Sequence, residues 1–216
     1  MARLLITSGP TRQYLDPVRY ITNCSSGLMG AALAQAALEL GHQVTILTGP
    51  VTICYPDAAS VIEVLSTDEM LSHAVAQFPD FDGVIGAAAP CDYKPSQVSQ
   101  EKLVKDGSGI NLELFETPDV IATLGQSKLD HQWVVGFALE TDDHRFRATT
   151  KAQQKCCDLI VLNGVTALNS TMTSIHILTQ QGECVLRAHG TKQDVSHEIL
   201  SVVQRRLIDF DGEEGP

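Results

Sequence analysis

The stretch DPVRYITNCSSGLMG, residues 16–30, decides the fold predicted for this chain. The apolar run Leu4–Thr7 before it predicts a buried strand, and the alanine-rich run 28–40 after it predicts a helix. The small residues 25–27 between them are of the kind expected where backbone N–H groups are left free at a helix start. Those groups and the helix dipole both favour phosphate. The stretch therefore predicts either an anion site or a well-capped helix that binds nothing.

The alternation of strand and helix continues along the chain. Gly41 ends the first helix, and Val44–Leu47 completes a strand–helix–strand unit, which is typical of a parallel sheet. Later strands are expected at 61–65, 84–89, 133–139 and 158–162, helices at 68–77 (capped by Thr67), 118–124 (opened by Pro118), 143–155 and 192–207, and a hairpin at 174–178 and 183–187. We predict the α/β class, with a Rossmann-like, mostly parallel sheet, helices on both faces and a C-terminal hairpin. One domain covers residues 1–208, and a flexible acidic tail follows at 209–216.

The regular alternation of predicted strands and helices is interrupted between residues 90 and 115. Pro90–Pro95 excludes a helix, 101–111 is charged and contains glycine, and only 112–115 has the pattern of a short strand. An irregular stretch of this length in a compact domain is typical of a functional loop. We therefore predict a flap over about 90–115, with a mobile monomeric loop as the alternative.

Charge and composition exclude several classes of partner. A formal net charge of −11 and an aromatic content of 5% argue against a general nucleic-acid or anionic-membrane binder. Six cysteines without a C-x-x-C pair predict free thiols of a reducing compartment. The sequence has no signal-peptide pattern and no apolar run of about 18 residues. We expect a cytoplasmic protein with neither nucleic-acid nor membrane partners.

Familiar cofactor and metal motifs are missing. The histidines and cysteines have no metal-ligand spacing, so we predict no metal held by protein side chains. The P-loop and the G-x-S-x-G nucleophile are absent, and only Gly27 and Gly30 remain of the dinucleotide fingerprint. An NAD(P)-binding Rossmann oxidoreductase is therefore weakened but stays open.

Positive side chains fall at selected positions. Arg12 and Arg19 flank the first loop, and Lys151 and Lys155 lie one helical turn apart. Like charges at this spacing repel mildly, so an anion bound between them would relieve the repulsion. The alternative is two solvated lysines on a surface face.

Six runs resemble one known family, in order and in spacing. They are ITSGPTRQYLDPVRYITNCSSGLMG, GAAAPCDYKP, EKLVKD, ETPDVIATLG, VVGFALET and KAQQKCCDLIVLN, which together span about residues 3–205. The chain resembles the phosphopantothenoylcysteine synthetase family, the ligase domain of coenzyme A biosynthesis.

The resemblance implies a nucleotide-dependent ligase. In the family, 4′-phosphopantothenate attacks the α-phosphate of a nucleoside triphosphate, CTP in most bacteria, and pyrophosphate leaves. The amine of L-cysteine then displaces the nucleotide from the acyl intermediate. Because the triphosphate and the carboxylate are both anions, cations and oriented N–H donors must hold them together. Mg²⁺ bound with CTP is the cofactor implied, and no flavin.

The resemblance also implies roles for single residues. Asn23 matches an asparagine that serves the acyl-phosphate, Arg19 the arginine four residues before it, and Lys102 the essential lysine of the flap, so these three are the implied catalytic residues. Asp92 matches an aspartate that reads the cytosine edge. Nucleotide binding is implied for Gly9, Ser25, Ser26, Gly27, Asp92, Lys102, Pro118, Asp119, Val120, Ile121, Phe137, Lys151 and Lys155.

The chain departs from the family pattern at three places. Leu28 replaces the lysine of SSGKMG, Pro90 and Cys91 replace Val-Ala before the aspartate, and Val104 breaks K-x-K-K. These changes leave the choice between CTP and ATP open. They also motivate a further alternative, a non-catalytic relative that binds a nucleotide.

The resemblance implies protein partners as well. The flap is expected to pair across a two-fold axis in a homodimer and to close over the neighbouring site. The flavin-dependent decarboxylase domain that many relatives carry is not in this sequence, so we expect the decarboxylase to be encoded separately.

Overall fold

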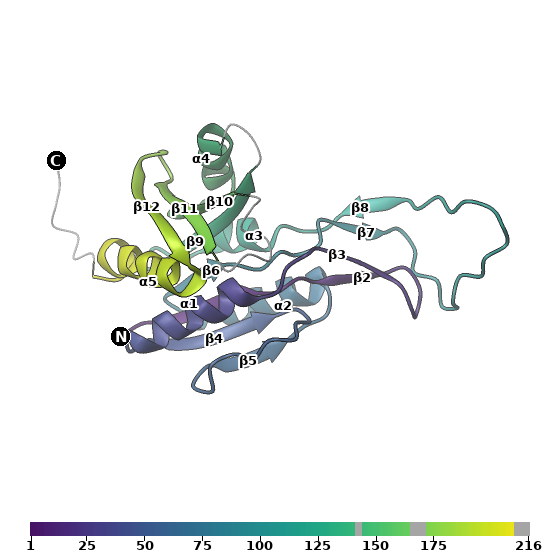
Figure 1. Cartoon of the computed structure of the whole chain (residues 1–216), viewed down its shortest axis with the longest axis horizontal. Helices are drawn as coiled ribbons and strands as arrows, with labels where there is room; N and C mark the ends of the chain where they lie inside the picture. Colours follow the sequence, from purple (N-terminus) through teal and green to yellow (C-terminus); the bar gives the residue numbers. More distant parts are fainter. Residues whose placement is uncertain (141–143, 165–171, 210–216) are drawn as a thin grey trace.

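A computed structural model describes residues 1–140, 144–164 and 172–209. In this part of the chain the centre is an eight-stranded sheet with the order β12-β11-β10-β9-β6-β1-β4-β5 (Figure 1). All neighbours from β10 to β5 pair in parallel, and β11 and β12 add an antiparallel edge. The predicted α/β class and mostly parallel Rossmann-like sheet are confirmed. The strands are β1 (Arg3–Ser8), β4 (Gln43–Thr48), β5 (Ser60–Glu63), β6 (Gly83–Gly86), β9 (Trp133–Glu140), β10 (Leu159–Gly164), β11 (Met172–Thr179) and β12 (Cys184–Thr191).

Helices cover both faces of the sheet, as predicted. On one face lie α1 (Leu28–Glu39) and α5 (Lys192–Val203). On the other face lie α2 (Thr67–Gln77), α3 (Val120–Ser127) and α4 (His144–Gln154). None of the helices in the described ranges is long and apolar enough to cross a bilayer.

Strand β1 shows why the sequences of the central strands are apolar at every position. Leu4 and Ile6 belong to the core layer beneath α1 and α5, whereas Leu5 belongs to the layer beneath α2, α3 and α4. Successive side chains of a strand point to opposite faces, so a strand covered on both sides must be apolar at every position. All three side chains are completely buried, and burial of each is worth about 1.5–3 kcal/mol relative to exposure.

The predicted C-terminal hairpin is present and extends the main sheet. β11 pairs with both β10 and β12. In β11, buried Thr173, Ile175 and Ile177 alternate with exposed residues. This alternation is the pattern of an antiparallel edge with one solvated face.

Two short strand pairs extend away from the sheet (Figure 1). β2 (Arg12–Tyr14) pairs with β3 (Tyr20–Thr22), and β7 (Tyr93–Pro95) pairs with β8 (Leu114–Glu116). We call residues 12–22 and 93–116 together the arm.

The predicted flap is largely the second half of the arm. The strand expected at 112–115 is β8, shifted by one or two residues, and its partner β7 lies within the run that excluded a helix. The hairpin of β2 and β3 was not predicted, because strands of three residues carry too little pattern to be distinguished from a loop.

α1 and α5 begin at the predicted residues, but the starts of α2, α3 and α4 differ from the predictions by one or two residues. α2 is capped by Ser66, whose hydroxyl accepts from Glu69 N at 3.1 Å. The prediction of Thr67 as the cap is wrong, because its hydroxyl bonds instead to that of Thr11 at 2.8 Å.

Other ends differ in the same way. α3 begins at Val120 with Asp119 as its cap, so Pro118 precedes the helix and does not open it. β6 ends at Gly86, which turns the rest of the strand expected at 84–89 into a loop. The six cysteines are all unpaired, as predicted. Of the predicted tail, 210–216 lies outside the described residues.

Candidate functional site

The order of the strands creates a crevice between β1 and β6. From β1 the chain continues to β4 and β5 on one side of the sheet, and then returns to β6, β9 and β10 on the other. β1 and β6 are neighbours in the sheet, and the order of the strands reverses between them. Such a switch point is where open parallel sheets bind ligands.

Two adjoining cavities lie at this edge of the sheet. The first, which we call the lysine pocket, has a volume of about 430 Å³ and is lined by Lys151 and the start of α3. The second, the helix pocket, has a volume of about 520 Å³ and is lined by residues 23–29, which lead into α1. The residues that line both are Ala88, Pro90, Asp92, Phe137 and Lys155. The two cavities are therefore two compartments with one common wall.

The start of α1 faces the helix pocket without a side-chain cap. Its N-cap is Gly27, and no side chain in the described part of the chain accepts from the first N–H groups of the helix. Gly27 has φ of 78°, and a Cβ atom there would lie 2.9 Å from Val51 Cγ1, so both conformation and space require glycine. The side-chain cap expected in the alternative interpretation is therefore absent among the residues that the structure describes. The donors at this helix start are oriented as an anion site needs them.

Asn23 fixes the loop that follows β6. Its Nδ2 donates to the carbonyl oxygens of Ala89 and Pro90 at 3.4 and 2.9 Å. Ala89 N donates in turn to the carbonyl oxygen of Gly9 at 2.9 Å. These bonds hold Asp92, at the end of this loop, between the two pockets.

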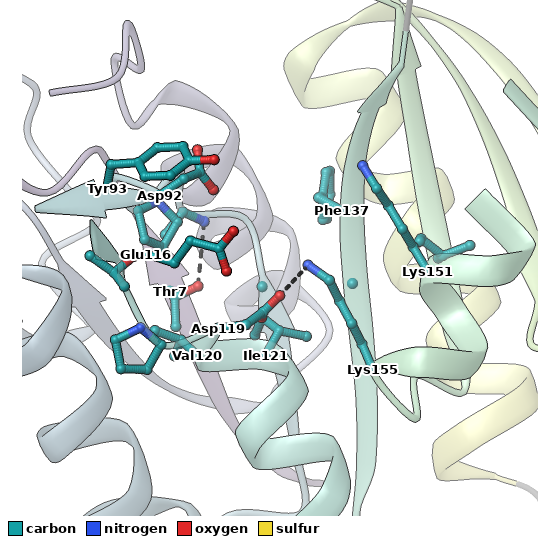
Figure 2. A pocket seen from close by; sticks show the side chains of 17 residues that line it. Thr7, Asp92, Tyr93, Glu116, Asp119, Val120, Ile121, Phe137, Lys151 and Lys155 are labelled. Carbon is teal, nitrogen blue, oxygen red and sulfur yellow. Dashed lines mark hydrogen bonds and ion pairs between the residues drawn. The ribbon is translucent and has the colours of Figure 1, made fainter. Parts of the chain in front are cut away.

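The lysine pocket has carboxylates on one side and ammonium groups on the other. Figure 2 shows Asp92, Glu116 and Asp119 facing the side chains of Lys151 and Lys155. Lys155 Nζ lies 2.8 Å from Asp119 Oδ2.

Asp119 has two partners in the pocket wall. Its Oδ1 accepts from Ala122 N at 2.9 Å and so caps α3. Burial alone would raise the pKa of the Asp119 carboxyl, but the bonds from Lys155 and Ala122 outweigh burial and lower this pKa below its usual value.

A strained turn places Lys155 at the end of α4. Cys156 has φ of 50°, which is rare for any residue other than glycine. Cys156 N donates to Gln153 O at 3.2 Å and Cys157 N to Ala152 O at 2.9 Å, the pattern of a Schellman motif. The Lys155 carbonyl also packs so closely on Gly125 that a Cβ atom there would lie 2.0 Å from its oxygen. The backbone of Lys155 is therefore fixed before any ligand binds.

Arg19 lies in the arm, away from both pockets. Its guanidinium donates to the Asp16 carboxylate, and to the Leu103 carbonyl at 3.1 Å. Burial would raise the pKa of Asp16, but N–H donors of Val18, Leu103 and Arg19, with the guanidinium, hold this pKa at about 2. Asp16 and Arg19 therefore tie the flap to the hairpin of β2 and β3.

The structure gathers most of the residues implied by the family resemblance, but not all of them. Around the two pockets lie Asn23, Ser25, Ser26, Gly27, Asp92, Pro118, Asp119, Val120, Ile121, Phe137, Lys151 and Lys155. Gly9, Arg19 and Lys102 line neither pocket, and Lys102 is exposed on the arm.

Sequence reasoning missed Asn163 and Lys192, which line the helix pocket. Asn163 Oδ1 is buried, and no described hydrogen-bond donor reaches it. Asn163 lies near the carboxyl end of a buried strand, where ligand sites of parallel sheets occur, so its position in the sequence could have identified it. Lys192 begins α5, and its position in the sequence did not indicate a ligand site. Burial lowers the pKa of its ammonium group.

No group of three metal-binding side chains exists in the described ranges. Asp92, Glu116 and Asp119 line the lysine pocket, but they do not form a ligand set. A divalent cation at this site would therefore take most of its ligands from phosphate oxygens and water, as Mg²⁺ commonly does.

The fold and the paired cavities define an α/β domain with a ligand crevice at the switch point of its sheet. The family model for the C-terminal domain of the DNA/pantothenate metabolism flavoprotein matches residues 1–207. The chain belongs to this family, and the resemblance to phosphopantothenoylcysteine synthetases is confirmed.

Curated relatives include the coenzyme A biosynthesis bifunctional protein CoaBC of Vibrio vulnificus, 40% identical over 207 residues, which are 93% of this chain and 51% of that protein. The CoaBC of Bacillus subtilis is 38% identical over 93% of this chain and 50% of that protein. The chain thus spans about half the length of the curated relatives it matches. A crystal structure of the C-terminal domain of CoaBC has 36% identity, a TM-score of 0.82 and 96% coverage of both chains. A Cab2 variant in complex with phosphopantothenate-cysteine, at 17% identity, has a TM-score of 0.79 over 94% of this chain and 85% of that chain, which shows a common fold.

Proposed function

We propose that this protein is a phosphopantothenate–cysteine ligase of coenzyme A biosynthesis. It joins 4′-phosphopantothenate to L-cysteine through an acyl-cytidylate, and converts CTP to CMP and pyrophosphate. One observation carries the proposal beyond family membership: the uncapped start of α1 and the two lysines at the end of α4 face adjoining cavities with a common wall. Two anionic reactants need such a pair of sites in contact.

Each compartment has a part in the proposed reaction. Lys151 and Lys155 neutralise the triphosphate, and the N–H groups at the start of α1 bind phosphate oxygens. Asp92 accepts from the exocyclic amine of cytosine. Asn23 acts next to the reacting acyl-phosphate.

The chemistry has two displacements at this common wall. The carboxylate oxygen of 4′-phosphopantothenate bonds to the α-phosphorus of CTP as the bond to pyrophosphate breaks. The cysteine nitrogen then bonds to the acyl carbon, loses a proton, and CMP leaves. Mg²⁺ carried by the triphosphate would neutralise part of its charge.

The arm supplies Lys102, and we propose that it does so across a homodimer. Lys102 lines neither pocket of its own chain, while Val104, Ile110 and Phe115 of the arm are 85%, 63% and 56% exposed. Apolar side chains concentrated on one extended segment favour a protein partner. A second copy would cover them and bring a lysine to the neighbouring site.

Pyrophosphate release from CTP tests the function directly. We expect release to require both 4′-phosphopantothenate and L-cysteine for full turnover, with CMP as the second product. Lys102→Gln, at an exposed position, should retain the fold and reduce turnover on the order of 10³-fold. Absence of release with CTP, ATP, GTP and UTP would refute the proposal. Tight CTP binding without turnover would favour a non-catalytic relative.

A further inference from the structure

Asp119 forms an ion pair with the ammonium group of Lys155, which the proposed reaction needs to bind phosphate. Nζ and Oδ2 are 2.8 Å apart, and the two side chains are 28% and 46% exposed. The pair thus lies on the wall of the lysine pocket, partly removed from water, where Figure 2 shows it reaching across the cavity. A phosphate oxygen that binds Lys155 must compete with this carboxylate.

Both partners are held in place independently of the pair. Oδ1 of Asp119 accepts from Ala122 N, and the Asp119 carbonyl accepts from Thr123 Oγ1 at 2.8 Å. Lys155 N donates to Lys151 O at 2.9 Å, in addition to the turn and the Gly125 contact described above. The carboxylate therefore stays at the start of α3 when the lysine leaves it.

The remaining charges of the pocket increase this competition. Asp92 and Glu116 also line the cavity, so carboxylates outnumber the two lysines there. The side chains that line the pocket therefore carry more negative than positive charges, and they repel a polyanion that enters it.

We propose that Asp119 limits the affinity of the site for polyphosphate. It holds Lys155 in the unliganded protein, yields the ammonium group to the nucleotide, and takes it back as pyrophosphate leaves. This inference rests on the proposed function, because it concerns the pyrophosphate made at the same site.

The chemistry explains why such a residue is useful. The triphosphate must bind and the pyrophosphate must depart, although both are polyanions that the same cations attract. A site with unopposed lysines would hold its product. A fixed carboxylate next to one lysine weakens both complexes and so favours product release.

Asp119→Asn isolates this effect. Asparagine caps helices as well as aspartate does, so α3 is kept while the charge is removed. We would titrate inorganic pyrophosphate and, separately, CTP into both proteins by calorimetry without divalent metal. The variant is expected to bind pyrophosphate about two- to fivefold more tightly, the size of a partly exposed ion pair. Pyrophosphate should also inhibit turnover by the variant at correspondingly lower concentration.

Two further variants separate the pair from general charge. In a Lys155→Gln background, Asp119→Asn should produce no more gain than Glu116→Gln does, because the contested ammonium group is gone. Glu116→Gln removes an equal charge from the same pocket without changing the pair, and should produce a clearly smaller gain.

The outcomes are distinct. If the wild type binds CTP and pyrophosphate but Asp119→Asn binds them no more tightly, the inference is wrong and the proposed function stands. An equal gain from Glu116→Gln would also overturn it, since bulk charge would then explain the affinity. A folded wild type that binds neither ligand in this titration nor in a repeat with Mg²⁺ would refute the proposed function itself.

Discussion

Leu28 changes the charge of the helix pocket by one side chain. It is 43% exposed, lines that pocket, and is the first residue of α1, directly after the uncapped Gly27. The family pattern has lysine at this position. An anion at this helix start would therefore depend on backbone donors, aided by other cations of the pocket such as Lys192.

Leu28→Lys should increase the affinity of the helix pocket for phosphate-bearing ligands. We expect the dissociation constant of 4′-phosphopantothenate to fall about three- to tenfold, because a partly exposed ammonium group adds roughly 1 kcal/mol of attraction. A cation at a helix N-terminus opposes the dipole, so the melting temperature should fall slightly. Calorimetry and thermal melts measure both effects. Leu28→Gln is the uncharged control, and an equal gain from it would contradict the electrostatic explanation.

At the scale of the element, the end of α4 is held in a conformation its sequence does not favour. A Schellman motif normally places glycine where Cys156 stands, and the left-handed conformation costs other residues roughly 1–2 kcal/mol. Strain of this kind persists only where the surroundings fix the backbone. Here the contact of Gly125 with the Lys155 carbonyl does so.

Cys156→Gly should stabilise the protein by about 0.5–1 kcal/mol, because relief of strain exceeds the added entropy of the unfolded chain. Urea unfolding followed by circular dichroism measures the change. Cys156→Ala removes the thiol but keeps the strained conformation, so it should produce no gain. If alanine stabilised as much as glycine, the explanation by backbone strain would be wrong.

The attachment of the flap to the first hairpin should depend on pH. The pKa of Asp16 is held at about 2, below the ordinary value of 3.8, so its bonds stabilise the arm fully above about pH 4 and are lost as the pH falls towards 2. The Leu103 amide, which donates to Asp16 Oδ2 at 3.1 Å, should lose hydrogen-exchange protection over this range. Asp16→Asn should show the same loss at neutral pH. Protection that persists in that variant would mean that other contacts hold the flap.

For the whole molecule, the role proposed for Lys102 would make catalysis depend on assembly. Wild-type protein is expected to be a dimer by light scattering, and Val104→Asp with Phe115→Asp should shift it towards monomer. Lys102→Gln and Lys155→Gln should each be inactive alone. Mixed dimers of the two would hold one intact site if Lys102 acts across the interface. An equimolar mixture should then recover about a quarter of wild-type activity. No recovery on subunit exchange would show that Lys102 serves its own chain.

Much of the fold could be predicted from the sequence, because buried parallel strands such as β1 are apolar at every position. The ends of helices were less predictable, since Ser66 and Thr67 are both good caps and only the contact with Thr11 decides between them. The arm was the least predictable part. Its three-residue strands have no usable periodicity.

For the site, the two cavities gather most of the residues that the family motifs identified. What they could not supply was the interaction between those residues. Asp119 and Lys155 were both expected to contact nucleotide, yet in the structure they contact each other. A sequence places two charges in one loop and one helix, but only the packing of α3 against the turn at Cys156 fixes their distance.

Lys155 borders both cavities, and this has a thermodynamic consequence. A charged group that lines two cavities couples the binding of ligands in them, because an anion bound in one cavity changes the binding free energy of a ligand in the other. By reciprocity, the second ligand changes the binding free energy of the first by the same amount. An anion that pairs with this ammonium group in one cavity would therefore weaken the binding of a second anion in the other.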